Sequence, residues 1–376
     1  MSEDFRKKLE AYERGEISEN EMEEMKKELE KFKSYRDHLD KMENKEKEKK
    51  AGGSRNKKWK KRLRTAFIAF ALFLVLSIVS SVLTALYYSW GDPSRADNYR
   101  NVIDHTLTVT DPYGYLGATS TNASPFFGLK TTRELNKQVG HDIIKAGDMK
   151  VNFRFSLMSF PERHDTGNVS QNNPVFVLPE AQGWELAEWD KLEQLAVGTV
   201  VSAFVSFAEL QGTEEVFQLF EDKEIDITWL AVNTGVEAED EWDEGIVFDP
   251  VGFPSFPIWH EDDMILDFRE EEKGLFGSRI VSESFSSPDY NAGEGEVLHK
   301  QFLKTLYFLQ EHERKANNLY FGDLKLSERI DFLENYGVFH YGAVITGPTK
   351  EILQLQGEPL ITRMEVDEVS FWNWME

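Results

Sequence analysis

Three histidines stand directly beside an aspartate, as Asp104-His105, His141-Asp142 and His164-Asp165. An imidazole paired with a carboxylate can act as a general acid or base, and both side chains can bind a metal ion. Neighbouring residues in a chain rarely face each other, and a lone histidine is more often structural or exposed. These pairs therefore predict chemistry only if folding brings their side chains together.

The sequence motifs of common enzyme classes are missing. His260-Glu261 and His312-Glu313 both lack the second histidine of an H-E-x-x-H zinc site, and no nucleophile elbow or phosphate-binding glycine loop occurs. The chain has no cysteine, which removes thiol catalysis, disulfides and cysteine-ligated zinc. We expect a protein that is not an enzyme and that uses no cofactor and no metal ion.

Two unusual segments could bind a ligand or simply be structural. The acidic run 237–244 (EAEDEWDE) could bind Ca²⁺, but it only half matches an EF-hand loop, at Glu241, Asp243 and Gly245. A solvated acidic loop is the alternative. The aromatic and proline-rich stretch 253–259 could form a partner surface, or it could pack over a sheet.

Residues 65–90 form an uncharged stretch that is apolar over most of its length. As a helix its 26 residues cover about 39 Å, enough to cross a hydrocarbon core of roughly 30 Å. The 64 preceding residues are too many for the leader of a cleavable signal peptide, and a soluble helix rarely runs this long without a charge. The stretch predicts one transmembrane helix that serves as an uncleaved signal anchor.

The charges around this stretch predict its orientation. The basic residues that precede it are Arg55, Lys57, Lys58, Lys60, Lys61, Arg62 and Arg64. Only Asp92, Arg95 and Asp97 follow closely. By the positive-inside rule, the N-terminus lies in the cytoplasm and residues 91–376 lie outside. Tyr87, Tyr88 and Trp90 suit the outer interface and Trp59 the inner one.

The two sides differ in net charge. Residues 1–90 carry +5 and residues 91–376 carry −29, which together make the −24 of the chain. The outer part should repel nucleic acid, so we expect no direct nucleic-acid contact. Cations or basic proteins are the plausible partners there. The lack of cysteine in an exported domain of this size favours a bacterial origin.

The first 45 residues predict two short amphipathic helices. Phe5, Leu9 and Tyr12 recur at helical spacing, Gly15-Glu16 ends the first helix, and Ser18 with Glu21 forms a capping box for the second. The apolar seam of the second helix consists of Met22, Met25, Leu29, Phe32 and Leu39. Residues 41–50 are charged and of low complexity, and Ala51-Gly52-Gly53-Ser54 predicts a flexible joint.

Two helices with so narrow a seam bury little surface alone, so we expect the seam to dock on another protein. A solvated spacer or a homodimeric coiled coil is the alternative. A docking module tethered beside the membrane is typical of a regulator that sequesters its client.

The outer segment predicts a mixed α and β domain. Residues 102–110 and 151–157 have strand character, while 111–130 and 159–182 are rich in turn residues. From about residue 184 the order helix, strand, helix, strand occurs, and it recurs at an offset of 136 residues. The expected strands are 200–207, 225–232, 338–346 and 361–369, and Thr213 and Thr349 are the expected N-caps of the intervening helices. If the repeat is real, two αβαβ halves share one sheet. Residues 296–319 predict a helix, and 371–374 should close a core strand.

The residues 332–352 (FLENYGVFHYGAVITGPTKEI) and 369–374 (VSFWNW) resemble the C-terminal domain of transmembrane sigma-factor regulators, of the family that negatively regulates sigma-M. The likeness continues through the amphipathic N-terminus, the single span, Lys137-Gln138-Val139-Gly140 and Gly252-Phe253-Pro254. The resemblance implies a zinc-free anti-sigma factor of a Gram-positive bacterium. Its inner helices would bind an extracytoplasmic-function sigma factor, and its outer domain would sense envelope stress or bind a second small membrane protein.

We therefore expect an α+β protein with short cytoplasmic amphipathic helices, one transmembrane helix and an extracytoplasmic α/β domain with two weakly repeated αβαβ halves. The expected regions are a cytoplasmic helical segment 1–45, a charged linker 46–64, the span 65–90, a membrane-proximal region 91–182 and a C-terminal domain 183–376 with an acidic insertion at 234–295. The expected sigma-binding residues, chosen from amphipathicity, are Phe5, Leu9, Tyr12, Met22, Met25, Leu29 and Phe32. A sensor or scaffold ectodomain tethered to a different cytoplasmic partner, and an exported hydrolase, are the competing hypotheses.

Overall fold

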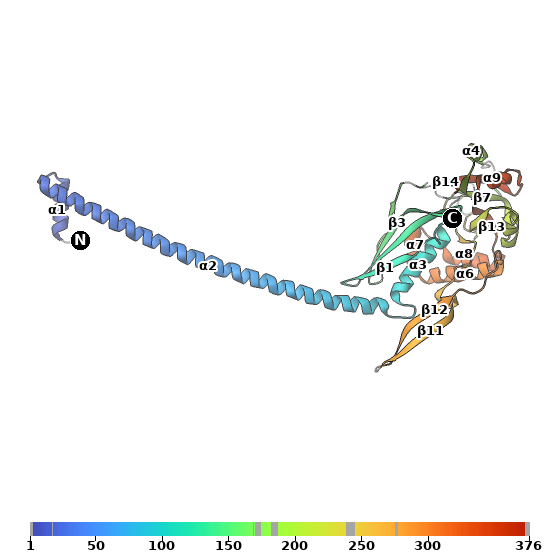
Figure 1. The fold of residues 1–376 in the computed structure, drawn as a ribbon, viewed down its shortest axis with the longest axis horizontal. Coiled ribbons are helices and arrows are strands. Elements are labelled where there is room, and N and C mark those ends of the chain that lie inside the picture. The colour runs from blue at the N-terminus through green and yellow to red at the C-terminus, as the bar shows by residue number, and fades with distance from the viewer. Residues whose placement is uncertain are drawn as a thin grey trace. The chain divides into compact units, whose positions relative to one another are not determined.

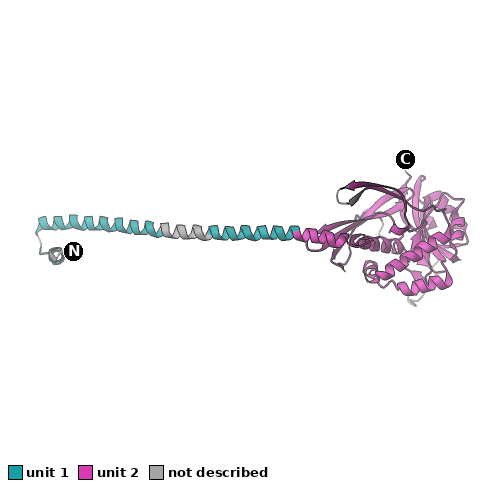
Figure 2. Cartoon of the chain, turned by 90° about the horizontal axis from the view of Figure 1, so that it is seen from below, with its two compact units in different colours: residues 1–78 teal, residues 79–376 magenta. Residues whose placement is uncertain are grey.

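The computed structural model describes residues 3–16, 18–167, 169, 174–181, 187–237, 245–274 and 277–372. Among these, the side chains of residues 3–5, 48–58, 274 and 277–279 are not described. The described chain is of mixed α and β class (Figure 1). It divides into two compact units, residues 1–78 and residues 79–376 (Figure 2).

The first unit begins with two helices joined by a short turn. Helix α1 runs Glu3–Glu13 and helix α2 runs Glu19–Ser89. Gly15 ends α1 because its φ of 69° lies in the left-handed region, which glycine adopts without strain. The backbone N–H and the hydroxyl of Ser18 both donate to Glu21 Oε2, at 3.2 and 2.7 Å, which is one half of the expected capping box. Both helices expected before the span are present, and their cytoplasmic location stays a prediction.

The expected span forms the last part of α2. Residues Trp59–Ser89 are long and apolar enough to cross a membrane, and their most apolar window is not buried against other described parts of the chain. Helix α2 continues through residues 51–54, so the prediction of a flexible joint there is wrong. The residues before it are mostly Lys and Glu, which favour a helix.

The second unit opens with helix α3 (Arg95–Thr110), where the sequence predicts a strand over 102–110. That prediction is wrong. The β-branched residues favour a strand locally, but Ser94 caps the helix by accepting from Asp97 N at 3.2 Å. Thr106 and Thr110 satisfy their hydroxyls within the helix by donating to Val102 O and Thr106 O, at 2.6 and 2.7 Å. Burial of Val102, Ile103 and Leu107 then outweighs the low helix propensity.

Helix α3 packs on an antiparallel sheet made of β1 (Thr119–Ser124), β2 (Gly128–Val139), β3 (Asp142–Arg154), β4 (Leu157–Met158) and β5 (Glu162–Asp165). The loops expected at 111–130 and 159–182 therefore contain strands, and both predictions are corrected. Strand β3 confirms the core positions Val151 and Phe153. It ends at Arg154, however, and Phe155 and Leu157 are 44% and 69% exposed instead of continuing the buried face.

The C-terminal sheet has the order β10-β8-β13-β7-β14, with all neighbours antiparallel. Four of the strands confirm the predicted ones: β7 (Thr199–Gln211), β8 (Asp226–Val232), β13 (His340–Pro348) and β14 (Ile361–Phe371). The edge strand β10 (Gly252–Pro254) comes from the aromatic and proline-rich segment. Phe371 is the last residue of β14, as expected, but its side chain is 74% exposed and adds nothing to the core. Residues 373 and 374 of the expected closing segment lie outside the described residues.

Both faces of the sheet are covered. One face packs Val201, Val205 and Ile345 against the helices α5 (Thr213–Phe220), α6 (Gly295–Glu311), α8 (Leu326–Tyr336) and α9 (Thr349–Leu353). The other face places Phe204, Trp229 and Tyr341 against Tyr113 and the short strands β6 (Phe176–Val177) and β9 (Ile246–Val247). Burial on both faces explains why β7 and β13 are mostly apolar and lack a regular alternation of polar and apolar residues.

The element order of the two expected halves is present as α4 (Trp189–Glu193)-β7-α5-β8 and α8-β13-α9-β14. Strands β7 and β13 pair at the centre, β8 adds beside β13 and β14 adds beside β7. Descent of the halves from one repeated unit stays a prediction. The N-cap positions are corrected: Gly212 and Pro348 occupy them, and Thr213 and Thr349 are the first helical residues.

The segment between the halves contains a 3-10 turn η1 (Glu261–Asp263), a two-stranded hairpin of β11 (Ile265–Gly274) and β12 (Gly277–Ser286), and helices α6 and α7 (Glu313–Tyr320). The two helices confirm the prediction over 296–319, with a break at His312. The hairpin was not predicted. Its described side chains include exposed Phe268 and Phe285. A second 3-10 turn, η2 (Gln354–Gly357), precedes β14.

Candidate functional site

The first unit has an apolar groove where α1 folds back beside α2. Leu9 of α1 lines it together with Leu29, Phe32, Tyr35 and Leu39 of α2. The four α2 side chains are between 38% and 64% exposed, and they follow one another at spacings of three or four residues. The groove is therefore an open apolar surface on one side of a helix.

The groove contains only part of the expected sigma-binding set. Leu9, Leu29 and Phe32 line it, while Tyr12 and Met22 are half-buried beside it. Met25 is 4% exposed, so it supports the helix pair from within and is unavailable as a docking side chain. Phe5 lies in α1 but its side chain is outside the described residues.

Tyr35 is the groove residue that the sequence reasoning missed. It is 64% exposed and stands three residues after Phe32 and four before Leu39, which is helical spacing. The predicted seam passes from Phe32 directly to Leu39 and so leaves out Tyr35. A helical projection centred on Phe32 would have found it.

The groove has a mainly basic rim. Lys26, Lys33 and Arg36 line it, with Glu30 as its acidic member. Among the described residues of this unit, exposed i, i+4 pairs such as Lys27–Glu23 and Lys47–Glu43 lie elsewhere along α2. Such exposed pairs add only weakly to the stability of the helix. An apolar partner surface edged by carboxylates would match the groove in shape and charge.

The basic residues that predict the orientation lie along α2 just before the span. Lys60, Lys61, Arg62 and Arg64 are exposed. Arg55, Lys57 and Lys58 lie in the part of α2 whose side chains are not described. Trp59 is 67% exposed, in keeping with the interfacial position expected for it.

The second unit brings histidines together, although not in the expected pairs. His105 stacks on His260 with 4.4 Å between ring centres, and His260 Nε2 lies 2.9 Å from the Thr305 hydroxyl. Burial lowers the pKa of His105 to about 3, with His260, Arg133 and Lys304 acting in the same direction. Burial also lowers the pKa of His260. His105 is therefore neutral near pH 7, and the two stacked rings act as packing groups.

A second buried group joins His299, Thr213 and His340. The Thr213 hydroxyl lies 2.6 Å from His299 Nε2 and 2.8 Å from His340 Nε2, and His340 Nδ1 lies 3.2 Å from Ala231 O. Because His340 Nδ1 must donate to the carbonyl, its Nε2 accepts from Thr213, and Thr213 accepts from His299. Burial lowers the pKa of His340 to about 3, and His299 adds to the effect. The group ties α5 and α6 to the sheet.

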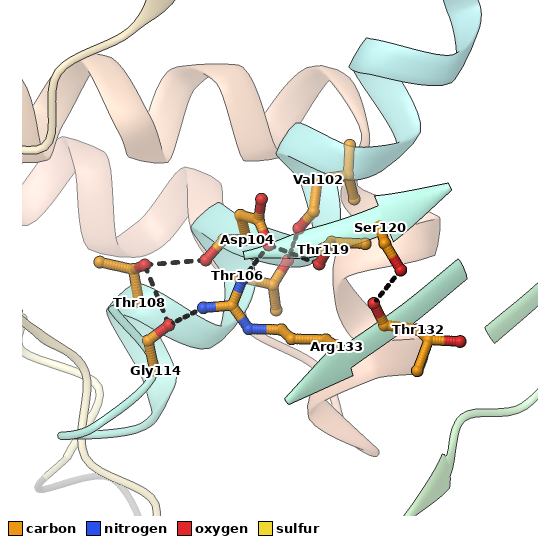
Figure 3. Close-up of polar contacts among 9 residues, drawn as sticks. All are labelled: Val102, Asp104, Thr106, Thr108, Gly114, Thr119, Ser120, Thr132 and Arg133. Carbon is orange, nitrogen blue, oxygen red and sulfur yellow. Dashed lines mark hydrogen bonds and ion pairs between the residues drawn. The ribbon is translucent and has the colours of Figure 1, made fainter. Parts of the chain in front are cut away.

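Asp104, expected beside His105 as an acid–base partner, instead binds Arg133. Arg133 Nη1 contacts Asp104 Oδ1, and Nη2 contacts Gly114 O (Figure 3). The Thr119 hydroxyl donates to the same Asp104 oxygen at 2.6 Å. Arg133 is 2% exposed, and its burial lowers its pKa, an effect that Asp104 opposes. The network connects α3 to β1 and β2. Asp104 pairs with Arg133 and Thr119 and not with His105.

The remaining histidine–aspartate pairs do not assemble a site. His164 Nδ1 lies 2.8 Å from the carbonyl of Arg163 on the exposed strand β5, and His141 packs edge-on against Trp372. Within the described part of the chain no group of three potential metal ligands comes together. Of the acidic run 237–244, only Glu237 is described, and it pairs with the buried Arg329, so the Ca²⁺ question lies outside the described residues.

The aromatic and proline-rich stretch 253–259 packs over the sheet. Phe253 and Ile258 are 1% and 8% exposed and belong to the main core, and β10 pairs with β8. Phe256 is the exposed member, at 45%. Of the two alternatives for this stretch, the structural one holds for most of its residues.

Two family models match the chain. The Sigma factor regulator N-terminal model matches residues 54–144 and the Sigma factor regulator C-terminal model matches residues 192–368. The chain belongs to this family of anti-sigma factors, which are regulators and not catalysts. It is 25% identical over 295 residues to the probable anti-sigma-M factor YhdL of Bacillus subtilis (strain 168), covering 77% of this chain and 74% of that protein. No solved structure matches. Both family matches begin after the groove of residues 9–39.

Proposed function

We propose that the chain is a membrane-anchored anti-sigma factor that holds an extracytoplasmic-function sigma factor, sigma-M-like in kind, at the inner membrane face. The groove lined by Leu9, Leu29, Phe32, Tyr35 and Leu39 is the sigma-binding surface. The span is a signal anchor that places the N-terminus in the cytoplasm and residues 91–376 outside a Gram-positive cell. A sigma factor held there is kept from RNA polymerase.

The groove is the single observation that carries this proposal. An exposed aromatic and aliphatic stripe of this kind is typical of a site that receives another protein. The basic rim favours a partner with carboxylates around an apolar centre. The name of the B. subtilis relative supports a sigma factor as that partner.

The second unit, residues 79–376, is called the outer unit from here on. It would respond to envelope stress and change the affinity of the groove for the sigma factor. Support comes from α2, because its residues Ser80, Thr84 and Tyr88 are hydrogen-bonded into the outer unit while the same helix begins in the groove. A second small membrane protein could bind the outer side of the same assembly. The alternative is a sensor or scaffold whose groove holds a different cytoplasmic protein.

The test is recovery of the bound protein from the cells that make this chain. The full-length, affinity-tagged protein is solubilised from membranes and the retained proteins are identified by mass spectrometry. We expect an extracytoplasmic-function sigma factor, lost with Leu29→Asp because a carboxylate in the groove must be desolvated on binding. Ser34→Asp is the matched control, since Ser34 lies on the opposite side of α2 and is exposed.

Two outcomes would overturn the proposal. The chain could retain an unrelated protein instead of a sigma factor, and Leu29→Asp could abolish that retention. This result would identify the chain as a tether for that partner. Equal loss of the sigma factor with Leu29→Asp and Ser34→Asp would show that the groove is not the binding surface.

A further inference from the structure

Two turns of the outer sheet lie against the last turns of α2. The β1–β2 turn contains Phe126 and Phe127, and the β3–β4 turn contains Phe155. Phe126 N donates to Ser80 Oγ at 2.6 Å, and Phe127 N donates to Thr84 Oγ1 at 2.9 Å. The side chains of α2 thus satisfy the backbone donors of the first turn.

The acceptors of both turns are also satisfied. The Tyr88 hydroxyl donates to Phe127 O at 2.9 Å and to Phe155 O at 3.2 Å, and Phe155 N donates to Phe127 O at 3.0 Å. Tyr88 is 2% exposed, so its side chain is buried against the second unit. Its expected position at the outer membrane interface stays a prediction. Non-helical backbone reaches membrane depth only when its polar groups are paired in this way.

All three phenylalanines adopt a backbone conformation that is unfavourable for bulky side chains. Their φ angles are 65°, 57° and 54°, in the left-handed region, where a bulky residue costs about 1–2 kcal/mol. Phe127 and Phe155 stack with ring centres 4.4 Å apart, and Tyr87 packs edge-on against both. Phe126 and Phe155 remain 50% and 44% exposed. Strain retained at exposed aromatic rings points to a use for those rings outside the domain.

The length of the span sets the depth of these rings. Only residues 65–79 separate Arg64 from Ser80, which is bonded to the Phe126 turn. At the helical rise this segment covers about 24 Å, less than the roughly 30 Å hydrocarbon core. With Arg64 at the inner boundary, the level of Ser80 is still inside the outer leaflet.

The charges next to the rings also suit a membrane surface. Lys130 of β2 and Arg154 of β3 are exposed beside the two turns, within an outer segment whose overall charge is strongly negative. Leu157, after the second turn, is 69% exposed. Aromatic rings flanked by long basic side chains are typical of segments that lie in the boundary between headgroups and acyl chains.

We infer that the β1–β2 and β3–β4 turns insert Phe126, Phe127 and Phe155 into the outer leaflet of the lipid bilayer, against the side of α2. This inference rests on the proposed crossing of the membrane by α2. The outer boundary of the span is then near residues 80–84 instead of Trp90. The inserted turns hold the outer unit at a fixed height and orientation on the membrane.

The absence of native cysteine allows a direct test by single labelling. Phe126→Cys is labelled with an environment-sensitive fluorophore in the full chain, reconstituted in nanodiscs that contain lipids with a nitroxide on the acyl chain. Pro125→Cys is a second probe that keeps all three phenylalanines. Leu76→Cys, in the span, is the lipid reference. Val197→Cys, a fully exposed site after α4, is the aqueous reference.

We expect quenching at positions 125 and 126 that is several-fold stronger than at 197 and of the order seen at 76. Quenching at 76 with none at 125 and 126 would overturn the insertion while the span stands. Lack of quenching at all four positions would instead contradict the membrane crossing itself. Circular dichroism and limited proteolysis verify that each labelled variant is folded.

Discussion

Lys137 Nζ lies 2.6 Å from Asp367 Oδ1, although 230 residues separate them in the chain. The Lys137 side chain is 11% exposed and that of Asp367 is fully buried. The Tyr113 hydroxyl donates to the other oxygen of Asp367 at 2.8 Å. The pair joins β2, in the sheet of β1 to β5, to β14 of the C-terminal sheet. It lies in the Lys137-Gln138-Val139-Gly140 segment, whose Gly140 N donates to Thr346 Oγ1 at 2.6 Å.

We expect Lys137→Met to destabilise the outer unit by about 3–5 kcal/mol, because it leaves the carboxyl of Asp367 buried without its cation. The measurement is the urea midpoint of the full chain in detergent, followed by tryptophan fluorescence. Lys145→Met is the control. Lys145 bridges Glu134 and Asp148 at the exposed surface, and its loss should change the midpoint little.

The effect of Lys137→Met should depend on pH. Burial raises the pKa of Asp367, and Lys137 opposes that rise. Without the lysine the pKa of Asp367 in the folded state moves higher. Between the unfolded and folded pKa values, the folded state then binds a proton that the unfolded state does not. The stability of the variant therefore falls as pH rises through this range. The loss in free energy of unfolding relative to wild type is therefore smaller at about pH 5 than at about pH 7.5. A loss independent of pH would contradict the pairing.

The buried histidines predict an acid-labile outer unit. The pKa of His105 is lowered from 6.5 to about 3, so below pH 6.5 the unfolded state binds a proton that the folded state excludes. Stability then decreases as pH falls, by about 1.4 kcal/mol per pH unit from this histidine. We expect His105→Gln to flatten the dependence of the free energy of unfolding between pH 6.5 and about 5.

His164→Gln is the matched control for that experiment, because His164 lies on an exposed strand and takes no part in the buried pairs. Its pH dependence should equal that of the wild type. If His105→Gln kept the wild-type slope, another group would have to cause the acid lability.

The C-terminal sheet could be predicted from sequence because its strands are buried on both faces. Runs such as 200–207 and 338–346 are mostly apolar, so their identity as strands depended little on context. Helix α3 could not, because Val102, Ile103 and Thr106 favour a strand locally and only their packing reverses that preference. The hairpin β11–β12 escaped detection because its described side chains are exposed, β11 is largely charged and β12 is rich in serine.

The candidate site was predictable to a similar extent. Helical spacing identified Leu29 and Phe32 as groove residues, but no local signal shows that α1 covers Met25. That burial depends on the turn at Gly15. The phenylalanine turns were beyond sequence reasoning, since the positive φ of Phe126 and Phe155 occurs in turns that are hydrogen-bonded to α2, which is distant in the chain.

The groove predicts where the binding energy for the sigma factor is concentrated. Phe32→Ala and Tyr35→Ala should each weaken the binding of the sigma factor by about 2 kcal/mol, or roughly 30-fold in Kd. Large aromatic side chains dominate the binding energy of such interfaces. Binding is measured by interferometry on the full chain in nanodiscs. Met42→Ala is the control, since Met42 is 58% exposed but lies outside the groove. An equal loss at Met42 would move the interface along α2.

The hydroxyl of Thr84 predicts how tightly α2 holds the outer sheet. Thr84 Oγ1 accepts from Phe127 N at 2.9 Å and donates to Ser80 O at 2.7 Å, and the residue is 1% exposed. Thr84→Val preserves the shape but leaves the Phe127 amide unpaired, which costs about 1–3 kcal/mol. Exchange of this amide with deuterium should therefore accelerate roughly 5- to 150-fold in nanodiscs. Thr65→Val is the control, because Thr65 donates only to Lys61 O within its own helix. Unchanged exchange in Thr84→Val would show that the sheet is held to the helix by its aromatic rings alone.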